Sequence, residues 1–134
     1  MNIKDKTIKI DMKEKLSTLW IVVMFSMVFA DILSFMIPGF LKQILDGTTD
    51  ITITQELLLV FSVLLAIPIP MIFLSRVLKY TLNRLANIIA SLITILFVIA
   101  GGSLYLHYIF FASIETLCMF LIIWNAWKWP KQNE

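Results

Sequence analysis

Two acidic residues stand inside long apolar runs of the sequence, and they have the clearest potential for chemistry. Asp31 lies in the run 16–37, and Glu115 lies in the run 109–127. A carboxylate in the hydrocarbon region of a membrane costs about 2.5 to 3.5 kcal/mol on insertion scales. We therefore expect each acid to face the inside of a helical bundle, to find a partner there, or to carry a proton.

The two acids are predicted to lie at the same depth in the membrane. Counting from the middle of each run, at about 1.5 Å per helical residue, puts their Cα atoms within roughly 2 Å of one depth. The same count places small or hydroxylated residues of the second and third spans in or near that layer, Ser62, Gly101, Gly102 and Ser103, while Ser34 shares a helical stripe with Asp31. His107 comes at the outer boundary, where it either relays protons to the acids or simply faces water. The candidate proton or substrate site is thus Asp31, Glu115, Ser34, Ser62, Ser103 and His107.

Two interpretations of this acid layer remain open. Two carboxyl groups in a low-dielectric layer without a Lys or Arg should not both ionise, so they can share a proton and form a proton-exchanging site. Alternatively, one or both are neutral acids that donate hydrogen bonds to Ser34, Ser62, Ser103 or a backbone carbonyl. In that case the acids fix how the helices pack.

The composition predicts a membrane protein. The chain has 134 residues, of which 60% are hydrophobic and only 15% charged, and the apolar residues come in runs rather than at regular intervals. Runs of this length cross a bilayer as helices. We predict an all-α fold, a four-helix transmembrane bundle with spans at about 16–37, 57–75, 88–106 and 109–127.

Lysine and arginine residues at the ends of the runs predict the orientation. They gather at 4–15, 76–84 and 128–131, and the positive-inside rule places such segments in the cytoplasm. We expect both termini there, in a multi-pass protein of the inner (plasma) membrane. The predicted organisation is an interfacial or cytoplasmic segment 1–15, a membrane domain 16–129 and a tail 130–134.

Several local patterns predict how the helices begin, bend and pack. Pro38-Gly39 should end the first helix, and 40–45 should form a short interfacial one. Thr52 and Gln55 fit a capping box at the start of the second span, and Pro68 with Pro70 should kink it, as a packing adjustment or as a gate.

Two stripes at helical spacing are predicted to face the bundle. The first is Met24, Met27, Asp31 and Ser34, and the second is Asn87, Ser91, Thr94, Val98, Gly101 and Tyr105. Gly101-Gly102-Ser103 is interpreted as a packing notch in the third span.

The sequence gives no support for a cofactor, a metal site or an enzymatic reaction. Cys118 is the single cysteine and His107 the single histidine, so zinc, redox and haem sites are not expected. No nucleophile, base and orienting residue occur at credible spacing. The bases show no nucleic-acid patch. The expected partners are the lipid bilayer and a small molecule or proton, with a homodimer left open.

Four segments resemble an uncharacterised family of small bacterial four-helix integral membrane proteins, a domain-of-unknown-function family. They are ADILSFMIPG (30–39), IPIPMIFLSR (67–76), NRLANI (83–88) and GGSLYLHYIFFASIE (101–115). The resemblance covers residues 15–129 and implies the fold, but it brings no activity. Two functions are therefore considered, a proton-linked or small-molecule carrier that uses the carboxylate layer, and a membrane scaffold or accessory subunit in which the acids are structural.

Overall fold

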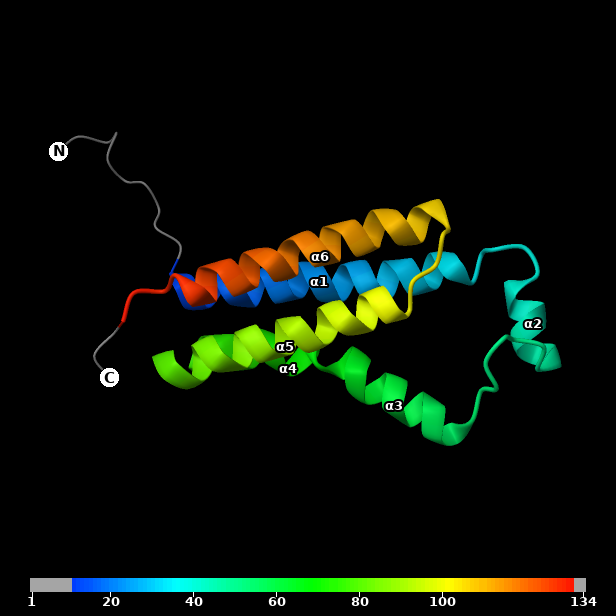
Figure 1. Ribbon diagram of the computed structural model, residues 1–134, viewed down its shortest axis with the longest axis horizontal. Helices are drawn as coiled ribbons and strands as arrows, with labels where there is room; N and C mark the ends of the chain where they lie inside the picture. The colour runs from blue at the N-terminus through cyan, green and yellow to red at the C-terminus, as the bar shows by residue number, and fades with distance from the viewer. Residues whose placement is uncertain (1–10, 132–134) are drawn as a thin grey trace.

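The computed structural model describes residues 11–131 and is all-α over that range (Figure 1). Its helices are α1 (Met12–Ser34), α2 (Phe40–Asp46), α3 (Gln55–Ala66), α4 (Pro68–Val77), α5 (Tyr80–Ala100) and α6 (Leu106–Trp127). With α3 and α4 taken together, four helices are long and apolar enough to cross a membrane. The predicted all-α fold is confirmed, and the four predicted apolar runs correspond to these four helices, while residues 1–10 and 132–134, from the predicted terminal segments, lie outside the described residues.

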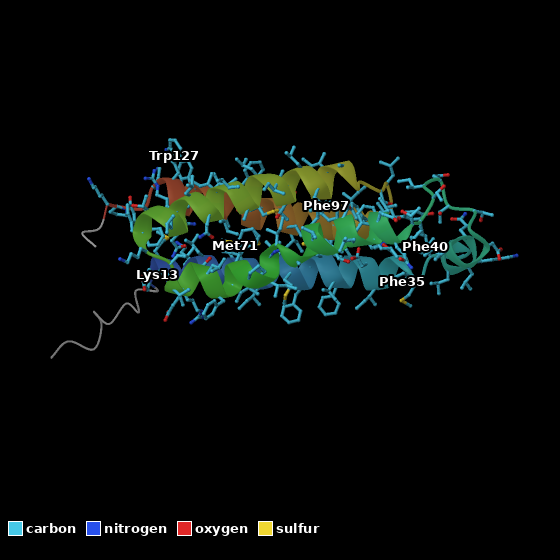
Figure 2. All side chains as sticks on the ribbon, turned by 90° about the horizontal axis from the view of Figure 1, so that it is seen from below. Lys13, Phe35, Phe40, Met71, Phe97 and Trp127 are labelled. Carbon is cyan, nitrogen blue, oxygen red and sulfur yellow. The ribbon has the colours of Figure 1, made fainter. Side chains whose placement is uncertain are left out.

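The spans form a closed bundle in which α1 packs most extensively against α6 and α4, and α5 packs against α6 and α4. The described chain begins and ends at one end of the bundle, which also holds the α4–α5 connection (Figure 1). We call it the terminal end. The opposite end, with α2 and the α5–α6 connection, is the loop end. Figure 2 shows Lys13 and Trp127 at the terminal end and Phe35 and Phe40 at the loop end.

The third span differs from its predicted bounds. Its helix begins at Tyr80 rather than 88 and ends at Ala100 rather than 106. The early start follows from buried hydrogen bonds that satisfy the polar side chains of the first two turns, described below. The early end places Gly101-Gly102-Ser103 in the connection to α6, so the predicted packing notch within the span is wrong.

The buried face of α1 is shifted from the predicted stripe. Its apolar core residues recur at alternating steps of four and three: Leu16, Trp20, Val23, Met27 and Ala30. Met27 belongs to both sets, but Met24 is only partly buried and Asp31 is exposed. One residue corresponds to 100° around a helix, which is enough to move a side chain from the centre of a face to its margin.

The polar stripe of α5 is buried as predicted from Asn87 through Ser91 and Thr94 to Val98. Its predicted continuation, Gly101 and Tyr105, falls beyond the end of the helix.

The prolines break the second span, as expected. Pro68 is the first residue of α4 and Pro70 lies in the same turn, where an amide hydrogen has no partner within the helix. The helix is therefore interrupted at Ile67, and α3 bends away from the bundle (Figure 1). No residue of α3 is buried.

The segments around α2 follow the sequence with one correction. The short helix predicted over 40–45 is present as α2, between Gly39 and Gly47, whose φ angles of 84° and 66° favour glycine. The predicted capping box is wrong, because α3 begins at Gln55 and its cap is Thr54, whose hydroxyl accepts the Leu57 amide at 3.1 Å.

A buried network closes the terminal end around Asn87, whose side chain is fully buried. Its Oδ1 accepts hydrogen bonds from Trp20 Nε1 at 2.7 Å and from Ser75 Oγ at 3.1 Å. Its Nδ2 donates to the backbone carbonyl and Oδ1 of Asn83, at 2.8 and 2.7 Å. One amide thus joins α1, α4 and α5.

Further contacts tie the same end together. Ser17 Oγ donates to the Ile72 carbonyl at 2.8 Å and accepts from Arg76 Nε at 3.0 Å. Arg84 Nε donates to the Ala126 carbonyl at 2.8 Å, near the end of α6. Each bond joins two spans, so the terminal end is held by polar contacts as well as by packing.

Candidate functional site

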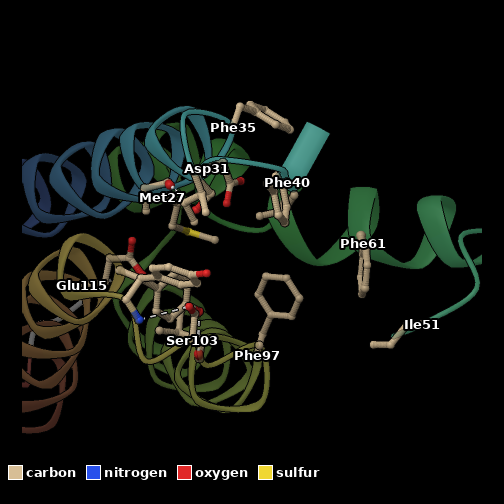
Figure 3. Close-up of a pocket in the computed structure, with 17 residues that line it drawn as sticks. Met27, Asp31, Phe35, Phe40, Ile51, Phe61, Phe97, Ser103 and Glu115 are labelled. Atoms are coloured by element: carbon tan, nitrogen blue, oxygen red, sulfur yellow. Dashed lines mark hydrogen bonds between the residues drawn. The ribbon is translucent and has the colours of Figure 1, made fainter. Parts of the chain in front are cut away.

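A cavity of about 540 Å³ opens at the loop end between α1, α3, α5 and α6. Figure 3 shows Met27 and Asp31 on one wall, Glu115 beside them, and Phe97 and Ser103 opposite. Most of its lining is apolar, and none of the lining residues is a Lys or Arg. The residues that bear acid or hydroxyl groups are Asp31, Ser34, Ser103, Tyr105, Tyr108 and Glu115.

Glu115 is the most buried of these groups. It lies on α6 with 3% of its surface exposed, and its side chain lines the cavity. Among the described residues, no hydrogen bond reaches its carboxyl group. Burial is costly for a polar group and more so for a charge, and within residues 11–131 the Glu115 side chain meets the cavity rather than a hydrogen-bonded side chain of a neighbouring helix.

Asp31 faces the same cavity from α1 (Figure 3). Its side chain remains accessible from the cavity, and again no hydrogen bond within residues 11–131 reaches its carboxyl group. Asp31 and Glu115 are near enough to interact electrostatically. The structure thus brings together the two acids that were assigned to one layer, on helices that pack against each other.

The hydroxyl groups near the acids are bonded to other atoms. Ser34 Oγ donates to the Ala30 carbonyl at 2.8 Å, and Tyr108 Oη donates to the Val98 carbonyl at 2.9 Å. Ser103 Oγ accepts the Tyr105 amide at 3.3 Å. The Ser34 and Ser103 bonds are local, while the Tyr108 bond joins α6 to α5, and none of the three involves the carboxyl group of Asp31 or Glu115.

Two predicted site residues lie outside the cavity lining. Ser62 is exposed on α3, and its hydroxyl donates to the Leu58 carbonyl at 2.7 Å. The helix turns Phe61 and Leu65, four residues apart, toward the cavity instead, so Ser62 does not join the acid layer. His107 is partly buried just outside the cavity, with Nε2 3.1 Å from Ser34 Oγ.

The sequence prediction missed the aromatic part of the site. Phe61 of α3 and Phe97 of α5 have ring centroids 6.2 Å apart, and this pair brings α3 against the bundle. Phe35 and Phe40, 6.1 Å apart, line the cavity from the loop end. In an apolar run, the sequence does not distinguish a phenylalanine that lines a cavity from one that faces lipid. These four residues could therefore not be predicted.

Comparison with known proteins gives a family and no function. Residues 4–134 match the family of unknown function DUF6326. The chain belongs to this family. No curated protein and no solved structure matches it. The predicted membership of an uncharacterised family is confirmed, while the bacterial source and membrane location that the resemblance implied are not part of the family description.

The site in this DUF6326 member suits a small molecule better than a metal ion. Within residues 11–131, no three His, Cys, Asp or Glu side chains gather where they could hold a metal. The cavity volume falls in the range of small-molecule pockets, which are mostly apolar with a few polar groups that orient the ligand. Two carboxyl groups on one wall can in addition take up or release protons.

Proposed function

We propose that this protein is a small proton-linked carrier, with the loop-end cavity as its binding site and Asp31 and Glu115 as the groups that exchange the proton. The observation that carries the proposal is the position of Glu115, a buried residue whose side chain lines the cavity together with Asp31, in a lining that contains no Lys or Arg.

The arrangement of the hydroxyl groups supports this proposal over a structural role. A structural acid would donate its proton to a serine or a carbonyl across a helix interface. Ser34 Oγ instead donates to the Ala30 carbonyl and lies 3.1 Å from His107 Nε2. Ser103 accepts the Tyr105 amide, so none of these contacts involves Asp31 or Glu115. Intramembrane acids that do not secure packing are, by default, candidates for proton or substrate pathways.

The bundle is closed at one end and open at the other, as a carrier in one of its access states would be. The network around Asn87 seals the terminal end, while the acids are reached from the loop end. A carrier must open the sealed end to release its ligand there.

We further propose that the terminal end faces the cytoplasm, in the plasma membrane. Arg76, Lys79, Arg84 and Lys128 lie at the terminal end, whereas the loop 35–54 carries Lys42 alone. In a Cys118→Ala background, an impermeant maleimide added to intact cells is expected to label Thr48→Cys and not Lys131→Cys. Labelling of Lys131→Cys alone would reverse the orientation.

Proton movement in vesicles tests the carrier proposal. The purified protein would be placed in vesicles that hold a pH-sensitive dye, and four classes of solute would be added outside: amines, amino acids, carboxylates and sugars. At least one class is expected to drive proton movement through the wild-type protein. Glu115→Gln is expected to abolish this movement because it removes the titratable group at nearly constant size.

Glu56→Gln is the matched control, since Glu56 is an exposed acid of α3 that does not line the cavity. It is expected to behave like the wild-type protein. If no class of solute moves protons, or if Glu56→Gln has the same effect as Glu115→Gln, the carrier proposal fails.

A second candidate function, a membrane scaffold, is favoured by α3. None of its residues is buried in the described chain, and large apolar side chains such as Leu59 and Val63 are exposed along it. Such a face can meet a partner helix in the membrane. This is the function that remains if the vesicle experiment finds no proton movement.

A further inference from the structure

We propose that the ligand of the loop-end cavity is an organic monocation, an amine or quaternary ammonium group carried on an apolar, preferably aromatic body. This inference rests on the proposed function and names the class of its substrate. It follows from three properties of the cavity, which are its charge, its apolar walls and the small number of oxygen ligands that it offers.

The charge of the cavity favours a cation. Asp31 and Glu115 both line it, and no Lys or Arg does. An anion would add a further negative charge to a low-dielectric site. A neutral ligand would leave an ionised carboxylate without compensation, which is costly at this depth. A single positive charge compensates one ionised carboxylate, while the other carboxyl group keeps its proton.

The walls favour an organic cation over a metal ion. Phe61, Phe97 and Tyr108 line the cavity, and the faces of aromatic rings attract ammonium groups within about 6 Å of the ring centre. Calcium and magnesium need six or more oxygen ligands. The cavity offers two carboxyl groups as charged ligands, with four hydroxyl groups spread over mostly apolar walls, and within residues 11–131 no three His, Cys, Asp or Glu side chains gather as they would around such an ion.

The cation and the proton are expected to compete. When the cation binds, a carboxyl group loses its proton to water and the carboxylate becomes the partner of the ammonium group, so one positive charge enters as one leaves. The titratable groups that face this position are Asp31 from α1, Glu115 and Tyr108 from α6 and Tyr105 from the loop, with Cys118 and His107 nearby. No titratable side chain of α5 lines it. Cation affinity is therefore expected to rise with pH, because fewer protons then occupy the carboxyl groups.

Binding in detergent tests this inference without any need for transport. Isothermal titration would compare benzyltrimethylammonium with benzyl alcohol and phenylmethanesulfonate, which share an aromatic ring and carry a positive, zero and negative charge. The cation is expected to bind the wild-type protein and the other two are not. Binding is expected to release a proton, seen as a dependence of the heat on the buffer.

Variants of the acids make the test specific. Glu115→Gln and Asp31→Asn are each expected to weaken cation binding by at least about tenfold, the change that corresponds to about 1.4 kcal/mol. Glu115→Asp keeps the charge and is expected to retain most of the affinity, which separates loss of charge from loss of fold. Glu56→Gln is the control outside the cavity. Equal binding of all three probes, or unchanged cation affinity in Glu115→Gln, overturns the inference.

The two proposals fail in different ways. If carboxylates or sugars drive proton movement in vesicles and benzyltrimethylammonium does not bind, the ligand class is wrong and the carrier stands. If benzyltrimethylammonium binds through Asp31 and Glu115 but no solute moves protons, the cavity binds cations without transporting them, and the carrier proposal fails.

Discussion

The two ends of this bundle use their polar residues in opposite ways. At the terminal end, Asn87 makes four hydrogen bonds that join three spans. At the loop end, Asp31 and Glu115 face a cavity, and no hydrogen bond within the described residues reaches them. The terminal end is therefore tied together by hydrogen bonds between spans, whereas the proposed function rests on the two acids of the loop end.

The break in the second span explains why the ends differ. On the terminal side of Ile67, α4 packs against α1 and α5, and the Ser75 hydroxyl donates a hydrogen bond to Asn87. On the loop side of Ile67, α3 bends away from the bundle and none of its residues is buried. The loop end therefore has only three closely packed spans, and the space that a straight fourth span would fill becomes the cavity.

The largest expected effect is on the terminal end. Asn87→Leu removes the shared acceptor and donor and leaves Trp20 Nε1 and the Ser75 hydroxyl buried without this partner. We expect a loss of about 2 to 4 kcal/mol in the free energy of unfolding, since each lost bond in a membrane protein costs about 0.6 to 1.7 kcal/mol. Unfolding by SDS in mixed micelles measures this value.

Asn125→Leu is the matched control for that measurement. Asn125 lies on α6 at the same end, and its amide donates to Leu121 of its own helix. A change below about 0.5 kcal/mol is expected, as for most surface substitutions. If the two leucine variants were equally stable, the network would not be what holds the terminal end.

A smaller effect is expected where α1 meets α4. Ser17→Ala removes the hydroxyl that donates to Ile72 and accepts from Arg76, and we expect a loss of about 1 kcal/mol in the same unfolding experiment. The neighbouring Thr18→Ala is the control, because Thr18 is exposed and bonds back to Glu14 in its own helix. Equal effects of the two changes would mean that the contact between the helices contributes nothing.

At the loop end, removing an acid is expected to leave stability unchanged or slightly increased. Glu115→Gln and Asp31→Asn take away charges that have no hydrogen-bond partner in the described chain, so each is expected to fall within about 0.5 kcal/mol of wild type or above it. The double variant is expected to gain less unfolding free energy than the sum of the gains in the two single variants, because both changes relieve the same repulsion between Asp31 and Glu115. A loss of 2 kcal/mol or more in either single variant would show a structural partner and favour the scaffold.

The sequence predicted the spans better than it predicted the site, for physical reasons. Apolar runs and prolines report local properties, so the four spans and the break at Pro68 followed directly. The buried face of α1 was misplaced by one residue, because in a membrane apolar side chains point both to lipid and to the core. Ser62 was assigned to the acid layer by depth alone, and depth does not reveal which way a helix face turns.

The hydrogen-bond network around Asn87 could not be predicted from the sequence, for a related reason. Asn87 was expected to face the bundle, but its partners Trp20 and Ser75 come from two other spans. Which side chains meet across spans depends on the rotation of each helix about its axis, and no single-helix pattern fixes that rotation.

The smallest expected change in stability is at the contact between α3 and the bundle. Phe61→Ala removes the ring that meets Phe97, yet α3 buries no residue, so the free energy of unfolding is expected to change by less than about 0.5 kcal/mol. Access to the cavity is expected to change more. An aromatic pair contributes about 0.5 to 1.5 kcal/mol, so its loss would raise the open population of α3 about two- to tenfold. The measurement is the rate at which a thiol reagent labels Ser103→Cys in a Cys118→Ala background, since Ser103 lines the cavity.

Phe73→Ala is the control, because Phe73 is exposed on α4 and lies outside the cavity lining. Faster labelling in Phe61→Ala alone would identify α3 as the movable wall of the site. Identical rates in the two variants would mean that the cavity is reached from the loop end without any movement of α3, and the prolines would then serve packing alone.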